Sequence, residues 1–447
     1  MRLSVRPLGA LAFSTLLVAH SAGGALAVEK PMDKLAIYAA KGPPDSCGPG
    51  CDHWIAIEGR VDEGSAARVE RFLRERKDIQ QPIYFNSPGG AMRDGLAIGR
   101  LLRARKAIGR VGRTIVDACP GTQTDDACTL IKTMREEVVA TVTSRGAVCG
   151  SACTFMLFGA PTREVAPDAI VAVHGARIAP QFRINVNAAQ REEAIARMHA
   201  EADRLTSAFV EEMGISRIAM ALADSVSPDD LHVLTRRELY GFRIDTRTQV
   251  ETAWIMQKGP APSVQKIVEV KTNSGFRKFE WRLVCGRGAD VRLIVAASGA
   301  RDQIGVGVIT LAAGAKPPTF TRLLTGAGPN EIWTAVISPE AMAEMLAASR
   351  LPVGEGVLPE PNTASIAFDI DTTGLRPALA ELTSACQQAP AGAATPKWPS
   401  TPSSPRSPWP AATNAPGPPN WPAPSPLISQ GIGLVGVRPP PPTAAPK

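Results

Sequence analysis

The pattern of apolar and polar residues in the first half of the chain alternates between two periods. Short apolar runs at residues 54–59 and 82–86 predict β-strands. Between them, residues 62–75 carry apolar side chains at helical spacing, and the same spacing recurs over 96–102 with arginines in between. Strand, helix, strand, turn and helix in this order predict βαβ units and a mainly parallel sheet.

This alternation of strand and helix continues to about residue 245. The predicted elements are strands at 110–116 and 138–143, a helix within 146–159, a strand ending at His174, a helix at 188–212, and a short strand, a turn and a helix within 229–241. The stretch at 117–137 carries Cys119 and Cys128 between two of these strands. We interpret it as a cystine-tied insertion.

Residues 246–388 have a different pattern, dominated by strands. The predicted strands are 265–271, 279–285, 291–297, 305–312 and 365–369, and a short amphipathic helix follows at 375–386. We expect three tryptophans in the core of this part, Trp254, Trp281 and Trp333. No catalytic constellation stands out here, so this segment is predicted to be a smaller β-rich domain.

The two ends of the chain differ from the rest. Arg2, Arg6, an apolar run at 8–19 and Ala25-Leu26-Ala27 are typical of a cleaved signal peptide at 1–27, with an uncleaved membrane anchor as the alternative. Residues 389–447 are rich in Pro, Ala, Ser and Thr and predict a disordered tail. Residues 28–245 and 246–388 are then the two folded domains.

Length, charge and hydropathy narrow the class of protein. A chain of 447 residues suggests two or three domains. The net charge of +7 is spread without a long Lys/Arg block, so a nucleic-acid partner is not expected. After the leader, no segment approaches the ~18 apolar residues of a membrane span. The mature protein is predicted to be periplasmic or secreted.

The eight cysteines favour disulfides over a metal site. Their even number suits an oxidising compartment, and the usual zinc-ligand spacings with His or C-x-x-C are missing. Sequence leaves the pairing open. Cys285 and Cys386 are the only two in the second domain and are natural partners. The candidates for disulfide bonds are Cys47, Cys51, Cys119, Cys128, Cys149, Cys153, Cys285 and Cys386.

Three features of the first domain carry candidate chemistry. Glycines in the turn Ser87-Pro88-Gly89-Gly90 let backbone N–H groups face a cleft and hold an oxyanion. Ser151 lies between Gly150 and Ala152 at the start of an apolar helix, where it is a candidate nucleophile or an ordinary N-cap. His174 ends a strand and is a candidate general base, or a plain structural histidine.

The order and spacing of these features resemble the ClpP serine peptidases of the ClpP/crotonase superfamily over about residues 54–245. The resemblance rests on the segments 55–61 and 83–90, on the spacing of Ser151 and His174, and on Leu234-Thr235 with Tyr240-Gly241. It implies a spiral of ββα units, with Ser151 as nucleophile and His174 as base. It also implies an oxyanion hole at Gly90, with Gly89 beside it, and Ala152.

The chain departs from that family at the third catalytic residue. The aspartate position falls on Leu231, and Asp230 is one residue away, which on a strand is the opposite face unless a bulge intervenes. Asp230, a backbone carbonyl or another acid remain open as the third member. Cys149 and Cys153 flank the serine and are interpreted as half-cystines bracing its loop.

Two hypotheses for function follow. The first is an exported serine hydrolase, a peptidase acting on peptides or unfolded exported polypeptides without an ATPase partner, a metal or a cofactor. The second is a non-catalytic scaffold that binds a peptide or protein. No lysine lies between Ser151 and Glu212, which argues against a Ser–Lys dyad, and coenzyme A is not expected in this compartment. The family resemblance implies a homo-oligomer.

Overall fold

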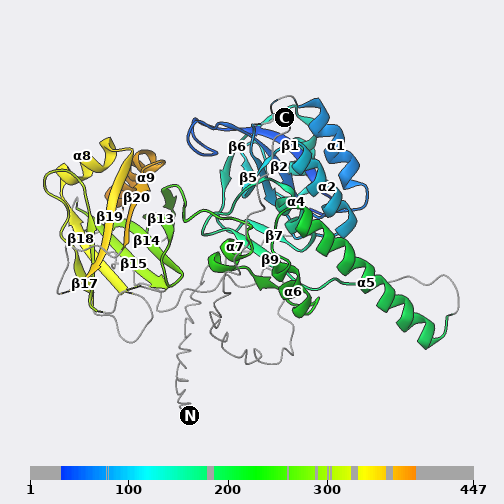
Figure 1. Cartoon of the computed structure of the whole chain (residues 1–447). Helices are drawn as coiled ribbons and strands as arrows, with labels where there is room; N and C mark the ends of the chain where they lie inside the picture. The colour runs from blue at the N-terminus through cyan, green and yellow to red at the C-terminus, as the bar shows by residue number, and fades with distance from the viewer. Residues whose placement is uncertain are drawn as a thin grey trace, which may run out of the picture. The chain divides into compact units, whose positions relative to one another are not determined.

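The computed structural model describes residues 32–76, 78, 80–178, 186–258, 261–286, 290–299, 302, 305–323, 331–358 and 366–388. All described residues belong to one compact unit (Figure 1). The predicted signal peptide and the predicted Pro-rich tail lie outside the described residues. Within the described ranges, no helix is both long and apolar enough to cross a membrane.

A seven-stranded, mainly parallel sheet underlies the first part of the chain. Its strands are β1 (Ala36–Lys41), β2 (His53–Glu58), β3 (Ile83–Asn86), β4 (Ile108–Val111), β5 (Arg113–Val116), β6 (Val138–Thr143) and β8 (Thr162–Glu164), in the order β5-β6-β1-β2-β3-β4-β8. The pairs β2/β3, β3/β4, β4/β8 and β1/β6 are parallel, whereas β1/β2 and β5/β6 are antiparallel. The βαβ pattern predicted from sequence is therefore present, within a mixed α/β fold.

Helices α1 (Ser65–Glu75), α2 (Met92–Ala104) and α4 (Ala152–Gly159) pack with this sheet (Figure 1). The helix α4 is buried on every side, since all eight of its residues are buried. It lies so close to α2 that a Cβ on Gly95 or on Gly99 would sit 2.5 Å from a backbone oxygen of α4. This glycine contact fixes the position of α4, and with it the residue that precedes the helix, Ser151.

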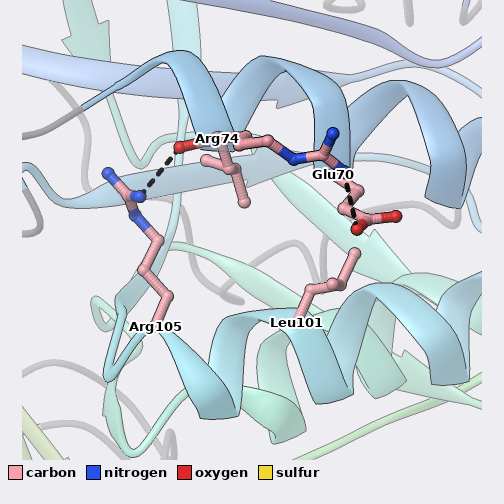
Figure 2. Close-up of a pocket in the computed structure, with 5 residues that line it drawn as sticks. Glu70, Arg74, Leu101 and Arg105 are labelled. Carbon is pink, nitrogen blue, oxygen red and sulfur yellow. Dashed lines mark hydrogen bonds and ion pairs between the residues drawn. The ribbon is translucent and has the colours of Figure 1, made fainter.

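The C-terminal ends of α1 and α2 leave a small cavity between them (Figure 2). Its volume is about 240 Å³, and its lining residues are Glu70, Leu73, Arg74, Leu101 and Arg105. Arg105 donates to the Leu73 carbonyl at 3.0 Å, and Arg74 pairs with Glu70 at 2.9 Å. Both arginines are thus already engaged within the protein.

A second, three-stranded sheet joins β7 (Val148–Gly150), β9 (Ile170–Val173) and β10 (His232–Val233). Strands β7 and β9 are parallel, and β10 runs antiparallel to β9. Three further helices are α5 (Ala188–Glu212), α6 (Ile218–Ser225) and α7 (Arg236–Gly241). The long helix α5 has the predicted bounds, and Asn187 and Gln190 form a capping box at its start.

The insertion at 117–137 contains a helix, α3 (Asp126–Met134), which sequence did not predict. The disulfide Cys119–Cys128 closes it, as interpreted from sequence. Lys132 anchors it to the sheet through a buried ion pair with Glu58 at 2.9 Å, and Tyr38 also donates to that carboxylate at 2.6 Å. Burial and the nearby Glu58 carboxylate raise the pKa of Tyr38 well above its usual value.

The second part of the chain is β-rich, as predicted. One sheet has the order β11-β13-β14-β15-β18-β17 with β12 beside β13, and the other has the order β16-β19-β20. The strands are β11 (Gln249–Glu251), β12 (Ile255–Gln257), β13 (Ser263–Lys271), β14 (Phe276–Cys285), β15 (Val291–Gly299), β16 (Gly307–Leu311), β17 (Thr321–Leu323), β18 (Glu331–Ile337), β19 (Arg350–Val357) and β20 (Ile366–Asp371). The helices are α8 (Pro339–Ala347) and α9 (Leu375–Gln388). Trp254, Trp281 and Trp333 are all buried in its core, as expected.

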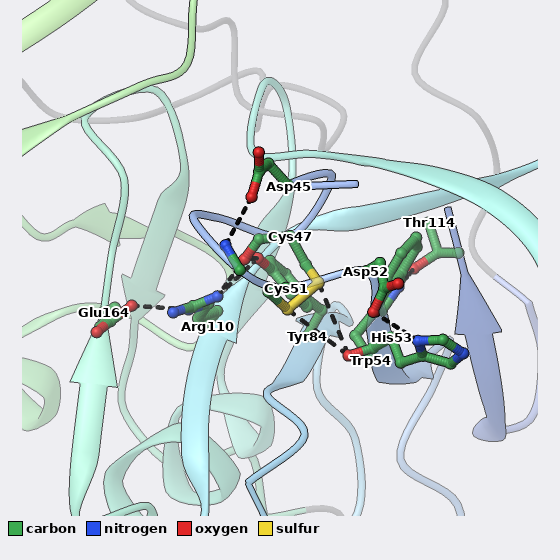
Figure 3. Close-up of a disulfide and its surroundings, with 11 residues drawn as sticks. Asp45, Cys47, Cys51, Asp52, His53, Trp54, Tyr84, Arg110, Thr114 and Glu164 are labelled. Carbon is green, nitrogen blue, oxygen red and sulfur yellow. Dashed lines mark hydrogen bonds and ion pairs between the residues drawn. A yellow bond between two sulfur atoms is a disulfide. The ribbon is translucent and has the colours of Figure 1, made fainter. Parts of the chain in front are cut away.

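All eight cysteines form disulfides: Cys47–Cys51, Cys119–Cys128, Cys149–Cys153 and Cys285–Cys386. Figure 3 shows the first of these, where Tyr84 donates to the Cys47 carbonyl at 3.2 Å. Arg110 also donates to that carbonyl and pairs with Glu164 at 2.7 Å (Figure 3). Four disulfides are compatible with an oxidising, extracellular or periplasmic compartment.

Candidate active site

Three parallel strands end at the same place, and a candidate residue follows each of them. Ser87 follows β3, Ser151 follows β7 and His174 follows β9. The backbones are in register there, because Ser87 bridges to Cys149 and Gly150 pairs with Ala172, each in parallel. Carboxyl ends of parallel strands are where open α/β sheets bind ligands. The sheet topology therefore brings the glycine turn, the serine and the histidine to one edge.

The turn at residues 87–90 is fixed by hydrogen bonds on both sides. The Val61 N–H donates to the Gly89 carbonyl at 2.8 Å, which ties the turn to the segment after β2. The Asn86 side chain accepts from the Val148 N–H at 3.1 Å, which ties it to β7. The Ser87 hydroxyl accepts from the Gly89 N–H at 3.1 Å. The turn is thus held rigidly beside the strand that leads to Ser151.

Ser151 has a backbone conformation that L-residues rarely adopt. Its φ is 52° and its ψ is −124°, outside the left-handed helical well. Such a conformation costs about 1–3 kcal/mol and persists only where the surroundings impose it. Here the Ser151 N–H donates to the Ala172 carbonyl at 2.9 Å, and the Thr154 hydroxyl donates to the Ser151 carbonyl at 2.6 Å. A strained serine between a strand and a helix is the geometry of a nucleophile elbow.

The Ser151 side chain does not cap the helix that it precedes. Ser151 occupies the N-cap position of α4, but its hydroxyl makes no capping hydrogen bond. An N-cap serine normally accepts from the N–H two or three residues later. The residue is half-buried. The capping role that sequence left open is therefore not taken, and the hydroxyl is available for chemistry.

Backbone donors surround the serine. A Cβ on Gly89 would sit 2.7 Å from both the Ser151 Cβ and the Ala152 nitrogen, so this glycine is what allows the turn and the serine to meet. Among the described residues, neither the Gly90 N–H nor the Ala152 N–H donates to another group of the protein. Two free N–H groups beside a serine at a helix N-terminus have the chemistry of an oxyanion hole.

A disulfide spans the serine. Cys149 on β7 and Cys153 on α4 are joined across Ser151, with their Cα atoms 5.2 Å apart. Both cysteines are fully buried. The interpretation of this pair as a brace of the serine loop agrees with its position, because the bond ties the strand before Ser151 to the helix after it.

His174 is half-buried and has a defined hydrogen bond. Its Nδ1 lies 2.7 Å from the Gly175 carbonyl oxygen. A carbonyl oxygen can only accept, so Nδ1 carries a proton, and in the neutral ring the lone pair is then on Nε2. This is the tautomer that a general base needs. Among the described residues, no direct hydrogen bond joins the Ser151 hydroxyl to His174, a contact that often tightens only when substrate binds.

Asp230 lies outside this arrangement. It is exposed in a turn in which its N–H donates to the Ser227 carbonyl at 2.9 Å. Within the described residues, no hydrogen bond or ion pair connects it to His174. His232 pairs with Val173 in the β9/β10 register, and Leu231, on which the aspartate position of the family falls, directly precedes β10.

Sequence reasoning missed three residues that position the site: Asn86, Thr154 and Gly175. Asn86 was included only as part of a strand, although a polar residue at the carboxyl end of an apolar strand is a usable signal. Thr154 follows Ser151 by three residues, the spacing of a local side-chain to backbone bond. Gly175 acts through its backbone carbonyl and its lack of a side chain. The only sequence signal for this role is its position directly after His174.

The cavity between α1 and α2 offers no competing chemistry. The cavity of Figure 2 lies at the opposite end of α2 from the glycine turn, and its charged groups are paired with each other or with backbone. No group of three or more His, Cys, Asp or Glu side chains in the described ranges is placed to hold a metal ion.

No family model matches the chain, and no curated protein matches it. Among solved structures, the chain is similar to a mutant of the 1510-N membrane-bound stomatin-specific protease, at 12% sequence identity and a TM-score of 0.25. The match covers 42% of this chain and 73% of the other. At such a TM-score the likeness carries no argument about the fold or the site of this chain.

Proposed function

We propose that this chain is an exported serine hydrolase, a peptidase that cleaves peptide bonds through Ser151 and His174. The observation that carries the proposal is the backbone of Ser151, with φ 52° and ψ −124° at the start of a buried helix. Strain of this kind clusters at active sites, where it presents a side chain to substrate. The proposal assigns the chemistry to residues 28–245, with the superfamily's spiral of ββα units, and leaves residues 246–388 outside it.

The proposed reaction has two halves. The Ser151 oxygen attacks the substrate carbonyl carbon while its proton passes to Nε2 of His174, and the C–N bond then breaks as that proton moves to the leaving amine. Water next attacks the acyl-serine, giving its proton to Nε2, and the serine oxygen leaves with the proton from the imidazolium. The Gly90 and Ala152 N–H groups hold the oxyanion in each half, and Gly89 leaves them room.

The proposed substrates are peptides or unfolded exported polypeptides. The free backbone N–H groups beside Ser151 suit an extended chain, whose carbonyl oxygens can accept from them. Four disulfides favour an oxidising compartment, in which an ATP-driven unfoldase has no energy source. The proposal also includes a location in the periplasm or outside the cell, a reaction without a cofactor, and assembly into a homo-oligomer.

Fluorophosphonate labelling of the oxidised protein tests the proposal. We expect the wild-type protein to be labelled at one site, Ser151→Ala to lose the label, and His174→Ala to slow labelling at least 100-fold, since a general base contributes about 10²–10⁴ in rate. Circular dichroism would show that each variant is folded. A folded wild-type protein that takes up no label would contradict the proposal.

A binding scaffold is the second candidate function. It is favoured by the lack of a Ser151–His174 hydrogen bond among the described residues and by the position of Asp230 away from His174. On this hypothesis the strand ends bind a peptide without cleaving it. Peptide binding of equal affinity by the wild type and Ser151→Ala, together with no labelling, would favour it.

A further inference from the structure

A serine–histidine pair needs a partner that fixes the imidazole. In serine hydrolases an acid on Nδ1 holds the ring in the right tautomer and orientation and stabilises the imidazolium that forms. The described residues contain no carboxylate hydrogen-bonded to His174. The group that occupies the place of the acid is the Gly175 carbonyl, 2.7 Å from Nδ1.

The residue that carries this carbonyl, Gly175, is held at its N–H by the end of helix α6. The Gly175 N–H donates to the Val226 carbonyl at 2.9 Å, and Val226 is the residue that caps the C-terminus of α6. Gly175 is buried against this cap. A Cβ there would lie 2.9 Å from the Val226 oxygen and within 3.7 Å of the carbonyls of the last helical turn. The peptide unit after His174 therefore has no freedom to move toward α6.

The charge at this helix end has the sign that the reaction needs. Backbone carbonyls at a helix C-terminus carry partial negative charge and favour a cation nearby. The carbonyls of Ala223 and Asp224 both lie within 3.7 Å of the Cβ position of Gly175. They lie beside Gly175, the residue after the histidine whose imidazole gains positive charge when it takes the serine proton.

We infer that Gly175, clamped by the C-terminal cap of α6, replaces the missing acid and acts as the positioning residue of His174. This inference rests on the proposed function and adds to it. The Gly175 carbonyl fixes the Nδ1–H tautomer, and the cap of α6 holds the N–H and crowds the Cα of the residue that carries this carbonyl. Asp230 then has no part in the reaction.

Gly175→Ala tests the inference, with Gly241→Ala as the matched control. The first change forces the peptide unit away from Val226, whereas a Cβ on Gly241 meets nothing within 4 Å. In fluorophosphonate labelling we expect Gly175→Ala to lower kinact at least about 10-fold, because a misplaced base loses much of its 10²–10⁴ contribution. KI should stay within about twofold, since the serine and its oxyanion donors are untouched. Gly241→Ala should match wild type in both constants.

The tautomer of His174 gives a second readout that does not depend on activity. Protein carrying ¹⁵N-histidine, assigned with a His174→Gln variant, should show a protonated Nδ1 and an unprotonated Nε2 for His174 at alkaline pH. In Gly175→Ala this pattern should weaken or reverse. A wild-type His174 with its proton on Nε2 would overturn the inference even if labelling is fast.

Two further outcomes separate the inference from the proposed function. If Asp230→Asn lowers kinact as much as Gly175→Ala does, the acid holds the histidine in the reacting enzyme and the inference fails while the hydrolase stands. If wild-type protein takes up no label but shows the Nδ1–H tautomer lost in Gly175→Ala, the geometry is right and the proposed function fails.

Discussion

At the residue scale, the turn and the nucleophile depend on each other. Ser151 adopts its strained backbone only because the neighbouring strand accepts its N–H and Thr154 donates to its carbonyl. Gly89, with φ 95°, approaches so closely that no side chain fits between it and the serine. One glycine therefore meets two requirements at once, since only glycine adopts this φ readily and only glycine fits.

The effect of Gly89 on the reactivity of Ser151 can be separated from the loss of stability that alanine causes at any position with positive φ. Gly89→Ala places a Cβ 2.7 Å from the Ala152 nitrogen and should slow Ser151 labelling at least about 100-fold, the usual loss for a damaged oxyanion hole. Gly64→Ala has a similar φ, 82°, but open space around its Cβ. It should lose roughly 1 kcal/mol of stability and label at the wild-type rate. Equal labelling of the two variants would contradict the crowding argument.

At the element scale, a buried carboxylate joins α7 to the end of β8. Asp245 accepts from the Val165 N–H at 2.9 Å and from Arg236, the first residue of α7, at 2.9 Å, and Arg247 pairs with it at 2.6 Å. Burial alone would raise the pKa of this carboxyl. The hydrogen bonds and charges of Arg247 and Arg236 outweigh burial and hold the pKa well below its usual range.

This network predicts how stability depends on pH. Because the folded-state pKa of Asp245 is depressed, its contribution is complete above the unfolded pKa, about 3.9, and is lost as pH falls from there. Asp245→Asn should unfold at a lower temperature at pH 7 and show a smaller further loss between about pH 4 and pH 2. Thermal unfolding by circular dichroism checks both points. Glu70→Gln, in an exposed ion pair, should change stability by no more than about 0.5 kcal/mol.

Sequence predicted the elements whose patterns are local. The bounds of α5 agreed with prediction because a capping box marks its start and its period is regular. The strand predicted at 110–116 is two strands, β4 and β5, separated at Gly112, where a Cβ would lie 2.5 Å from the Tyr84 ring. That break depends on a tertiary contact. Helix α6 and strand β1 carried no boundary signal that we recognised, and packing determines them.

The candidate site likewise has features with a local sequence signal and features that depend on tertiary contacts. Ser151 stood out because it lies between small residues at the start of a predicted apolar helix, and His174 because it ends a predicted strand. The hydrogen-bond acceptor for the His174 ring could not be singled out from sequence. Every residue has a backbone carbonyl, and the sequence does not mark which one lies beside the ring. Sequence reasoning therefore left Asp230, a backbone carbonyl or another acid open as the third member. The hydrogen bond from Nδ1 to the Gly175 carbonyl became visible only with the fold.

At the scale of the whole molecule, the four disulfides differ in what they can stabilise. Cys285–Cys386 spans 101 residues and joins the end of β14 to α9 in the β-rich part. The other three span 4, 9 and 4 residues. Loop-closure entropy grows with the length closed, so the long disulfide constrains the unfolded chain most, and the short ones mainly fix local geometry.

Removing the long disulfide should weaken the β-rich part alone. We expect Cys285→Ser with Cys386→Ser to lose about 4–5 kcal/mol of stability there, against about 2 kcal/mol for the local pair in Cys47→Ser with Cys51→Ser. Hydrogen exchange should show lost protection in β13–β15 and unchanged protection in β2 and β3. Ser151 labelling should remain at the wild-type rate. Slower labelling in the first variant would mean that the two parts are coupled.

The short disulfide across Ser151 has a practical consequence for anyone who produces this protein. A chain expressed in the reducing cytosol of a bacterial host would carry Cys149 and Cys153 as thiols, on the two sides of the residue that an activity assay interrogates. Such a preparation could be soluble and compact while its serine lacks the bond that spans it. Thiol titration of each batch should therefore precede any conclusion that the protein is inert.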